Sequence, residues 1–330
     1  MKNYISLSER IFIAGASGMV GSSIFRQLLK AGYGDIKKQG IIFTPSRKEL
    51  DLLDSESVKR WFDKNKPSIV ILAAAKVGGI VANNNFPADF IFENLKIQTN
   101  IIETAWRSGS KRLLFLGSSC IYPKFANQPI KEESLLTGSL EYTNECYAIA
   151  KIAGIKLCQS LRQQYDFDAI SLMPTNLYGP GDNYHPTNSH VFASLISKFC
   201  IAKKNSLEEV ICWGSGRPRR EFMHVDDLGR AVLFVLENWN PKSSDAPIDK
   251  HNKPLSFMNV GTGKDISIID LANKIANIID YKGKIIWDTS KPDGTPRKLL
   301  DVEKINSLGW FAKIDLEEGI RKTIVEFLKS

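Results

Sequence analysis

Three side chains that carry a hydroxyl, a phenol and an ammonium group are spaced so that they could act on one carbonyl group. Tyr147 and Lys151 stand four residues apart in YAIAK, so a helix puts both on one face. Ser118 follows the apolar run RLLFL, where a buried strand is predicted to end. A tyrosine that donates a proton near neutral pH needs its pKa lowered by about 3 units, which a neighbouring ammonium favours. We predict that Ser118 and Tyr147 bind a carbonyl oxygen and that Lys151 assists the tyrosine.

Cys120 lies two residues after Ser118, in LGSSCIYP. Most free cysteines are small buried hydrophobic residues, and this is the alternative for Cys120. The five cysteines of the chain form an odd number without CxxC spacing, so neither a disulfide framework nor a metal site is expected. Because of its place at a strand end beside Ser118, we expect Cys120 at a reactive site.

A glycine-rich turn near the start predicts a dinucleotide site. Three glycines follow the strand RIFIA with the spacing GxxGxxG and open a helix that runs to about Leu29. Glycines let the backbone approach a pyrophosphate, and the amino end of the helix supplies N–H donors. The predicted binding segment consists of Gly15, Ala16, Ser17, Gly18, Met19, Val20 and Gly21.

The end of the second predicted strand indicates which dinucleotide fits. NAD-binding chains usually carry an acidic residue there, which holds the ribose 2′-hydroxyl. This chain has Ser46 and Arg47 instead. A hydroxyl and a guanidinium bind a 2′-phosphate, which an acidic group would repel. We therefore predict NADP(H) as the cofactor, and the alternative is that Arg47 is a solvated loop charge.

Strand-like and helix-like segments alternate through the first half of the chain, which predicts a parallel sheet covered by helices. We expect an α/β fold with a Rossmann-type doubly wound parallel sheet and a smaller, interleaved C-terminal substrate domain. The predicted dinucleotide domain spans 1–177, with returning segments at about 222–240 and 255–263. The loop-like stretch YGPGDNYHPTNSH opens the second region, so 178–330 is predicted to form mainly the substrate domain.

Composition and charge exclude several classes of protein. The chain of 330 residues has the hydrophobic and charged content of a globular protein. No apolar run approaches the roughly 20 residues of a membrane span, and the start resembles no signal peptide, so we expect a cytoplasmic protein without a membrane partner. The formal charge of +8 comes from scattered cations without a nucleic-acid-binding motif. We expect no nucleic-acid partner, and the surplus suits an anionic small substrate.

Several motifs together resemble one family along the whole chain. GASGMVG, SSCIYP, YAIAK, PTNLYGP and REFMHVDD resemble the extended short-chain dehydrogenase/reductase family. NECYAIAKIAGIKLCQS, REFMHVDD after WGSG, and SKPDGTPRKLLD are similar, more specifically, to its GDP-L-fucose synthases. That family converts GDP-4-keto-6-deoxy-D-mannose to GDP-L-fucose by epimerising C3 and C5 and then reducing the C4 ketone with NADPH. The resemblance implies the same enzyme activity and substrate here, and a homodimer.

The resemblance also implies roles for individual residues. It makes Ser118, Tyr147 and Lys151 the reductase triad, and Cys120 and His190 the acid–base pair of the epimerisation. The residues that it assigns to the substrate are Lys198, Trp213, Arg220, Asp293 and Lys298. Those that it assigns to the cofactor, besides the glycine turn, are Lys151, Pro174, Thr175, Asn176, Leu177 and His190.

Cysteine and histidine suit this chemistry. C3 and C5 flank the C4 carbonyl, so inversion can pass through an enolate, with a base on one face and an acid on the other. A thiol needs its pKa lowered by only about 1–2 units to act as a base near neutrality, and histidine already titrates there. We prefer His190 to His185, His224 and His251 because it opens the apolar helix VFASLISKF after a predicted N-cap at Asn188–Ser189.

Other functions were weighed against this one. An epimerase/reductase of another GDP-4-keto sugar, such as a heptose, is not separated by the motifs. A dehydratase would need a carboxylate where Ser119 and Cys120 stand, and a simple 4-epimerase would hold NAD, which Arg47 disfavours. A non-catalytic scaffold should have lost part of the triad, and this chain retains all of it. Ser119 has no assigned task.

Overall fold

The larger part of the molecule is a parallel sheet of six strands. The computed structural model describes residues 3–185, 189–291 and 293–329. The strand order is β2-β1-β3-β4-β5-β9, and every neighbouring pair is parallel. The strands are β1 (Arg10–Ala14), β2 (Ile41–Phe43), β3 (Ile69–Leu72), β4 (Arg112–Leu116), β5 (Asp168–Pro174) and β9 (Phe257–Val260). The predicted Rossmann-type sheet is confirmed.

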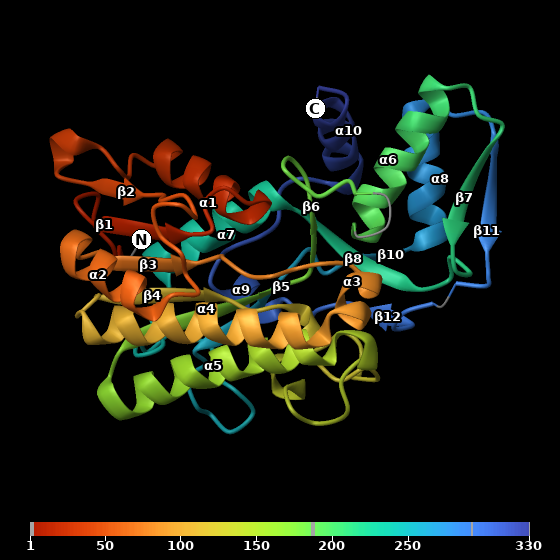
Figure 1. The fold of residues 1–330 in the computed structure, drawn as a ribbon. Helices are drawn as coiled ribbons and strands as arrows, with labels where there is room; N and C mark the ends of the chain where they lie inside the picture. The colour runs from red at the N-terminus through yellow and green to blue at the C-terminus, as the bar shows by residue number, and fades with distance from the viewer. Residues whose placement is uncertain (1–2, 186–188, 292, 330) are drawn as a thin grey trace.

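Helices cover both faces of this sheet (Figure 1). On one face α1 (Met19–Lys30) packs against α7 (Val225–Asn238), and on the other α4 (Pro87–Arg107) packs against α2 (Ser55–Asn65) and α5 (Glu145–Tyr165). The central strands β3 and β4 are buried along their whole length. Continuous apolar runs such as IVIL and RLLFL are required by this position, because a strand covered on both faces has no side in water.

Local capping explains where the helices begin. Asp54 accepts a hydrogen bond from the backbone N–H of Glu56 and so caps α2. Helix α4 begins at Pro87. Proline is favoured at a first helical position, because the N–H that it lacks would have no partner there. A short helix, α3 (Ile80–Asn85), precedes it.

The remaining elements form a second, smaller body around a hydrophobic cluster of its own, which includes Phe192, Phe199 and Leu271. Its strands form two small sheets: β8 (Arg219–His224) pairs with β6 (Asn176–Tyr178), β10 (Asp265–Ser267) and β12 (Arg297–Lys298), while β7 (Glu209–Trp213) pairs with β11 (Lys284–Asp288). Its helices are α6 (Val191–Lys204), α8 (Ile268–Ile279) and α10 (Leu316–Phe327). Figure 1 shows this body beside the large sheet.

The chain passes between the two bodies more than once. Segment 222–240 begins in β8 of the smaller body and continues as α7, which packs on α1 of the larger one. Segment 255–263 contains β9, the last strand of the large sheet, and α9 (Glu303–Ser307) packs against it. The division into domains at 177 stays a prediction. Within the described ranges, no helix combines the length and apolar character that crossing a bilayer requires.

The parallel sheet brings several predicted site residues to one edge. In a parallel sheet all strands point the same way, so the segments that follow β1, β2, β4 and β5 leave at the same carboxyl edge. These segments contain Gly15, Arg47, Ser118 and Thr175. The fold therefore gathers at one edge residues that are up to 160 positions apart in the sequence.

Candidate active site

A tight turn at the end of β4 positions Ser118 and Cys120. The strand ends at Leu116, and residues Ser119–Ile121 form one turn of 3₁₀ helix. Ser118 caps this turn, because its hydroxyl accepts a hydrogen bond from the backbone N–H of Cys120 at 3.2 Å. A small residue with a hydroxyl group is what such a cap requires, which explains the polar sequence after an apolar strand.

Helix α5 brings Tyr147 and Lys151 to the same place. The Lys151 ammonium is buried and donates a hydrogen bond to the carbonyl of Leu116 at 2.9 Å, and it lies 5.8 Å from the centre of the Tyr147 ring. The Ser118 hydroxyl lies close enough to the Tyr147 phenol to act on its pKa, in the lowering direction. The structure therefore brings together the serine, the tyrosine and the lysine that the spacing of YAIAK and LGSS pointed to.

The electrostatics of this group differ from our expectation for the tyrosine. Burial lowers the pKa of Lys151 to about 7. Burial also raises the pKa of Tyr147 above its ordinary value, the Cys120 charge raises it further, and the hydrogen bond from Ser118 only partly opposes them. Lys151 does not lower the tyrosine pKa as expected, since the lysine itself loses its charge near neutral pH. Tyr147 is held protonated, which is the state of a proton donor.

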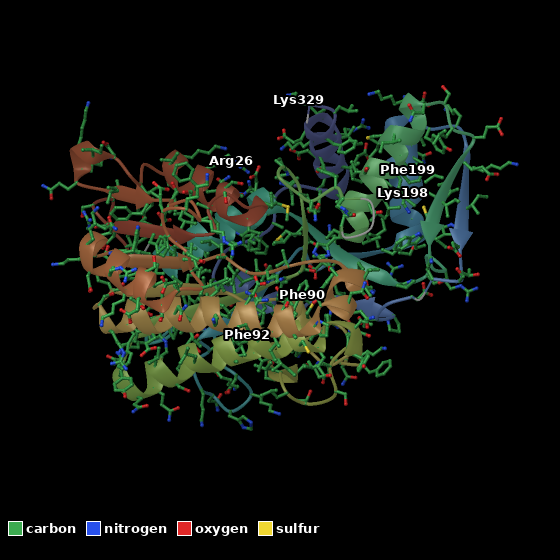
Figure 2. All side chains as sticks on the ribbon, in the orientation of Figure 1. Arg26, Phe90, Phe92, Lys198, Phe199 and Lys329 are labelled. Carbon is green, nitrogen blue, oxygen red and sulfur yellow. The ribbon has the colours of Figure 1, made fainter. Side chains whose placement is uncertain are left out.

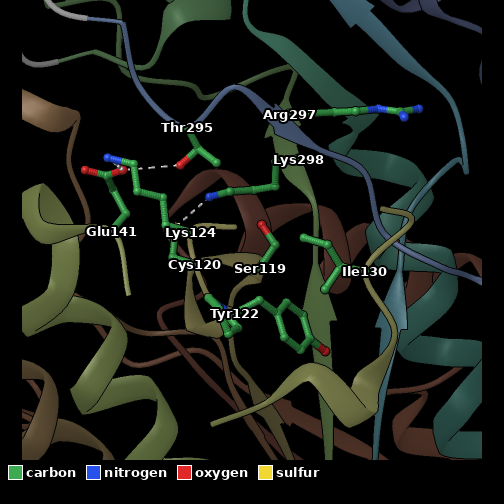
Figure 3. Close-up of a pocket in the computed structure, with 10 residues that line it drawn as sticks. Ser119, Cys120, Tyr122, Lys124, Ile130, Glu141, Thr295, Arg297 and Lys298 are labelled. Atoms are coloured by element: carbon green, nitrogen blue, oxygen red, sulfur yellow. Dashed lines mark hydrogen bonds and ion pairs between the residues drawn. The ribbon is translucent and has the colours of Figure 1, made fainter. Parts of the chain in front are cut away.

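Cys120 has nitrogen donors on its sulfur. Lys298 Nζ and Asn144 Nδ2 each lie 3.5 Å from Cys120 Sγ. Figure 3 marks the contact between Lys298 and Cys120. Burial raises the pKa of the half-buried thiol, but the Lys298 ammonium, hydrogen bonds from Ser118 and Lys298, and the Arg220 guanidinium outweigh it. The pKa of Cys120 is therefore below the ordinary value for a thiol, the direction that a general base near neutrality requires.

A pocket opens beside this sulfur (Figure 3). Its wall consists of Ser119, Cys120, Tyr122, Pro123, Lys124, Ile130, Glu141, Thr295, Arg297 and Lys298. Lys124 and Glu141 form an ion pair of 2.9 Å in the wall, and Thr295 donates a hydrogen bond of 3.5 Å to Glu141. Ser119 is thus part of the pocket wall. Among the described residues, no three or more His, Cys, Asp or Glu side chains are gathered as metal ligands.

His190 stands at the amino end of α6. Our predicted cap at Asn188–Ser189 needs correction, because the N-cap is His190 itself and the helix begins at Val191; Asn188 lies outside the described residues. The side chain of His190 reaches solvent, yet the surrounding protein and then the Lys298 ammonium lower its pKa. Lys298 therefore acts electrostatically on both Cys120 and His190. His224, in contrast, is buried and caps α7.

In the glycine turn, Gly15 and Gly21 leave no room for a side chain, whereas Gly18 does. Gly15 has φ +86°, and a Cβ there would meet Ala74 Cα at 2.8 Å. A Cβ on Gly21 would meet the backbone of Gly15 and Ala16. Gly18 caps α1 with ordinary φ, and its nearest neighbour would be 3.6 Å away. The first turn of α1 has no side-chain cap and no acidic residue, so its N–H groups are free to bind an anion.

The other predicted cofactor residues flank this turn along the sheet edge. Ser46 and Arg47 follow β2, where the Ser46 N–H donates to the Glu49 carboxylate at 2.7 Å and the Arg47 side chain is exposed. Thr175 and Asn176 both donate to the carbonyl of Glu221, at 3.2 and 2.8 Å. The last two predicted residues of this group are Pro174, which ends β5, and Leu177, in β6.

Four of the five residues predicted to bind substrate lie in two groups. Arg220 and Lys298 are register partners on the paired strands β8 and β12, beside Cys120. Lys198 belongs to the second group: its Nζ donates to the carbonyl of Ile211 at 2.8 Å and lies 5.3 Å from the Trp213 ring centre. Trp213 is 44% exposed, and Lys291 Nζ also lies 5.7 Å from its ring centre.

Asp293 connects the chain segment that precedes Lys298 to the loop after β7. Its carboxylate accepts hydrogen bonds from the Ser215 N–H at 2.9 Å and the Ser215 hydroxyl at 2.6 Å. The two groups of predicted substrate residues are thereby linked.

Comparison with known proteins identifies the family. Residues 11–246 match the model of the NAD dependent epimerase/dehydratase family. The GDP-L-fucose synthase of Escherichia coli (strain K12) is 52% identical over 98% of this chain and 97% of its own length. The chain belongs to the GDP-L-fucose synthase family. GDP-L-fucose synthase 1 of Arabidopsis thaliana is 51% identical over 98% of this chain and 94% of its own. The predicted family is thus confirmed.

A solved structure extends the likeness. A GDP-mannoheptose C4 reductase from Campylobacter jejuni, with NADP bound, superposes with a TM-score of 0.84 and is 36% identical. The match covers 99% of this chain and 100% of that one.

In this member of the GDP-L-fucose synthase family, two residues at the site were missed by the sequence analysis. Asn144, which contacts Cys120, stands three residues before Tyr147, so helical spacing could have placed it on the same side. Glu221 is fully buried, and its carboxylate accepts hydrogen bonds from the backbone of residues 262, 263 and 300. No local pattern could have found Glu221, because all its partners lie at least 40 residues away.

Proposed function

We propose that the protein is a GDP-L-fucose synthase. It converts GDP-4-keto-6-deoxy-D-mannose to GDP-L-fucose by epimerising C3 and C5 and then reducing the C4 ketone with NADPH. One observation carries this proposal: a thiol with a lowered pKa lies beside a serine–tyrosine pair that can bind a carbonyl oxygen. A reductase needs the pair alone, whereas an epimerising reductase also needs a base next to it. The identity of about half of all residues with the E. coli enzyme supports the same substrate.

The cofactor is NADP(H). The residues fit it: the amino end of α1 has uncapped N–H groups for the pyrophosphate, and Arg47 is exposed at the end of β2 for a 2′-phosphate. A structural relative whose name includes bound NADP supports this assignment. When bound, the nicotinamide supplies or accepts the hydride at C4. We assign its nicotinamide half to Asn176 and Leu177.

Epimerisation uses the same oxygen site as reduction. Ser118 and Tyr147 donate hydrogen bonds to the C4 oxygen, which stabilises the negative charge of the enolate. Cys120, as thiolate, takes the proton from the carbon next to the carbonyl, and His190 returns a proton on the opposite face. Solvent then takes the proton from Cys120 and reprotonates His190, and the same exchange at the second carbon completes the double inversion. Cys120 and His190 both have shifted pKa values, and the Lys298 ammonium acts on both, which supports their assignment as an acid–base pair.

Reduction requires one proton at the C4 oxygen for each hydride at C4. Tyr147 is the proton donor, which agrees with the raised pKa that keeps it protonated. Lys151 holds the end of β4 against α5 next to Tyr147, since its Nζ donates a hydrogen bond to the carbonyl of Leu116 at 2.9 Å. The GDP moiety is assigned to the two cationic groups: Arg220 meets the diphosphate, and Lys198 with Trp213 and Asp293 meets the distal part of the nucleotide.

We further propose a cytoplasmic homodimer. All five cysteines are free thiols, which is typical of a reducing compartment. Helices α4 and α5 pack on each other and carry exposed apolar side chains, with Phe92 60% exposed and Ile149 42% exposed. Figure 2 labels Phe92 on α4. Such a face is suited to a second copy of the chain. Light scattering of the purified protein at micromolar concentration tests this, and a monomer at all concentrations contradicts it.

The decisive experiment mixes the purified protein with NADPH and GDP-4-keto-6-deoxy-D-mannose and identifies the product by NMR. We expect NADPH oxidation and GDP-L-fucose. The second candidate, a reductase of GDP-4-keto-heptoses, is favoured by the likeness to the mannoheptose reductase, so a GDP-4-keto-heptose is assayed in parallel. No NADPH oxidation with the deoxymannose substrate refutes the main proposal. Oxidation with the heptose alone establishes the second.

Two variants separate the half-reactions. Tyr147→Phe removes the proton donor, so we expect NADPH oxidation to be nearly abolished. Cys120→Ser removes the base and keeps the oxygen site, so exchange of the C3 and C5 protons in heavy water should slow more than C4 reduction does. Unchanged turnover of the Phe variant, or parental exchange in the Ser variant, would remove the corresponding residue from the mechanism.

A further inference from the structure

Lys298 faces a sulfur atom. The resemblance to the family assigned this residue to the substrate, yet Figure 3 shows its side chain directed at Cys120. Its Nζ lies 3.5 Å from Cys120 Sγ, and the Asn144 amide nitrogen lies at the same distance. An ammonium group and an amide NH₂ can only donate hydrogen bonds. The sulfur is therefore the acceptor in both contacts. A thiolate fills that role more strongly than a thiol, because hydrogen bonds to a charged acceptor are about twice as strong.

The backbone around Lys298 is anchored, so its ammonium is held at the sulfur. Strand β12, which contains Lys298, pairs with β8. The backbone N–H of Leu299 donates a hydrogen bond to the Gln128 side chain at 2.8 Å, and the N–H of Leu300 donates one to the buried Glu221 carboxylate at 2.9 Å. The side chain of Lys298 is half-buried. A lysine that projects into solvent and binds phosphate there would not need its backbone fixed in this way.

Lys298 also differs from the other cations of the pocket wall, because they form ion pairs with carboxylates and the described part of the structure shows none for Lys298. Of the other cations in the pocket wall, Lys124 pairs with Glu141 and Arg297 pairs with Asp265. In the part of the chain that the structure describes, no Asp or Glu pairs with the Lys298 ammonium. Among the described residues, the side chain that hydrogen-bonds the Lys298 ammonium is Cys120. Within the described residues, the side chain that can neutralise the positive charge of Lys298 is Cys120, in its thiolate form.

The other charged groups that face the thiol agree with a negative sulfur. Arg220, on β8, adds positive charge. Tyr147, on α5, remains protonated and neutral. Of the carboxylates that act on Arg220 beside the thiol, Glu141 is already paired with Lys124 at 2.9 Å, and Asp293 accepts hydrogen bonds from Ser215. His190, at the start of α6, also faces Lys298, which disfavours a second positive charge there.

We propose that Lys298 is a positioning residue that holds Cys120 as a thiolate, with Asn144 directing the sulfur, before any substrate enters. The use of this thiolate as the epimerisation base rests on the proposed function, whereas the thiolate itself is a property of the free protein. The proton that Cys120 takes from C3 or C5 then resides on sulfur, next to an ammonium that keeps its charge. Lys298 thereby acts on catalysis through Cys120.

The test compares Lys298→Met, which keeps the length and removes the charge, with Lys298→Arg, which keeps the charge. Each ligand-free full-length protein is treated with iodoacetamide across a range of pH, and the modified peptides are quantified by mass spectrometry. Cys146 is the internal reference, because it is the second half-buried cysteine and the other three are buried. We expect alkylation of Cys120 near neutral pH to fall about tenfold in the Met variant and to be largely retained in the Arg variant, since the thiolate is the reactive form.

Two results would overturn the proposal. One is the parental pH profile of Cys120 alkylation in the Met variant. The other is an equal change at Cys120 and Cys146, which would indicate a general change in folding. This assay needs no substrate, so it remains decisive even if the protein turns over no GDP-sugar and the proposed function fails.

A second readout uses the reaction itself. In the Met variant, the pH profile of C3 and C5 proton exchange should move to higher pH, and the rate near neutrality should fall about tenfold more than that of C4 reduction. The Arg variant should restore most of the exchange. If instead the Met variant raises KM and leaves the pH profile in place, Lys298 is a phosphate ligand only, and the proposal is wrong.

Discussion

Replacing Gly21 by alanine should destabilise the protein, whereas the same change at Gly18 should affect cofactor binding alone. A Cβ on Gly21 would lie 2.7 Å from Ala16 Cα and closer still to the carbonyl oxygen of Gly15, where ordinary contact begins at 3.4 Å. All of these neighbours are backbone atoms. They cannot move aside as the end of a flexible side chain could, so the start of α1 would have to shift away from β1.

The expected cost follows from two opposing effects. Overpacking of this kind costs about 3 kcal/mol when the neighbours cannot give way. Gly21 lies inside α1, where alanine is better than glycine by about 1 kcal/mol. We therefore expect Gly21→Ala to lower the free energy of unfolding by about 2 kcal/mol. Gly18 meets nothing nearer than 3.6 Å, so its replacement should change stability by less than about 1 kcal/mol, the cost of a poorer N-cap.

Urea unfolding of both variants measures these changes, and NADPH fluorescence measures binding. If Gly18 is where the backbone approaches the pyrophosphate, Gly18→Ala should weaken NADPH binding about tenfold or more while leaving the protein stable. Parental stability of Gly21→Ala would show that the turn is not packed as described. Parental NADPH affinity of Gly18→Ala would remove that glycine from the cofactor site.

Three further predictions concern the same site. Glu221→Gln offers one acceptor oxygen where the carboxylate uses two, so at least one of the N–H groups at 262, 263 and 300 loses its partner. Urea unfolding should show a free energy of unfolding lower by about 1–3 kcal/mol. An unchanged free energy of unfolding would refute these hydrogen bonds. The pKa of Lys151 is lowered to about 7 in the folded protein, so below that pH its charge destabilises the fold. Lys151→Met should therefore raise the melting temperature at about pH 6, and the gain should shrink as the pH rises toward about 10; destabilisation at about pH 6 would contradict this. Arg47→Ala should raise KM for NADPH about tenfold with little change for NADH, and an equal change for both would place the guanidinium away from the 2′-phosphate.

The sequence by itself determined the fold class and half of the candidate site. Apolar runs such as IVIL are continuous because strands of a parallel sheet are buried on both faces, so the strands could be predicted locally. The glycine spacing after β1 and the four-residue spacing of Tyr147 and Lys151 depend on one turn and one helix. Interactions of short range leave patterns that can be recognised without the rest of the molecule.

Only the tertiary structure decided what these residues experience. Lys298 reaches Cys120 across 178 residues, and Glu221 binds segments at least 40 residues away, so no local pattern records either contact. The pKa of Lys151 falls to about 7 because the ammonium is buried between α5 and the end of β4. The position of the lysine in YAIAK could not indicate this burial. Charge–charge interactions and desolvation depend on distance in space, and that distance is defined only after the chain has folded.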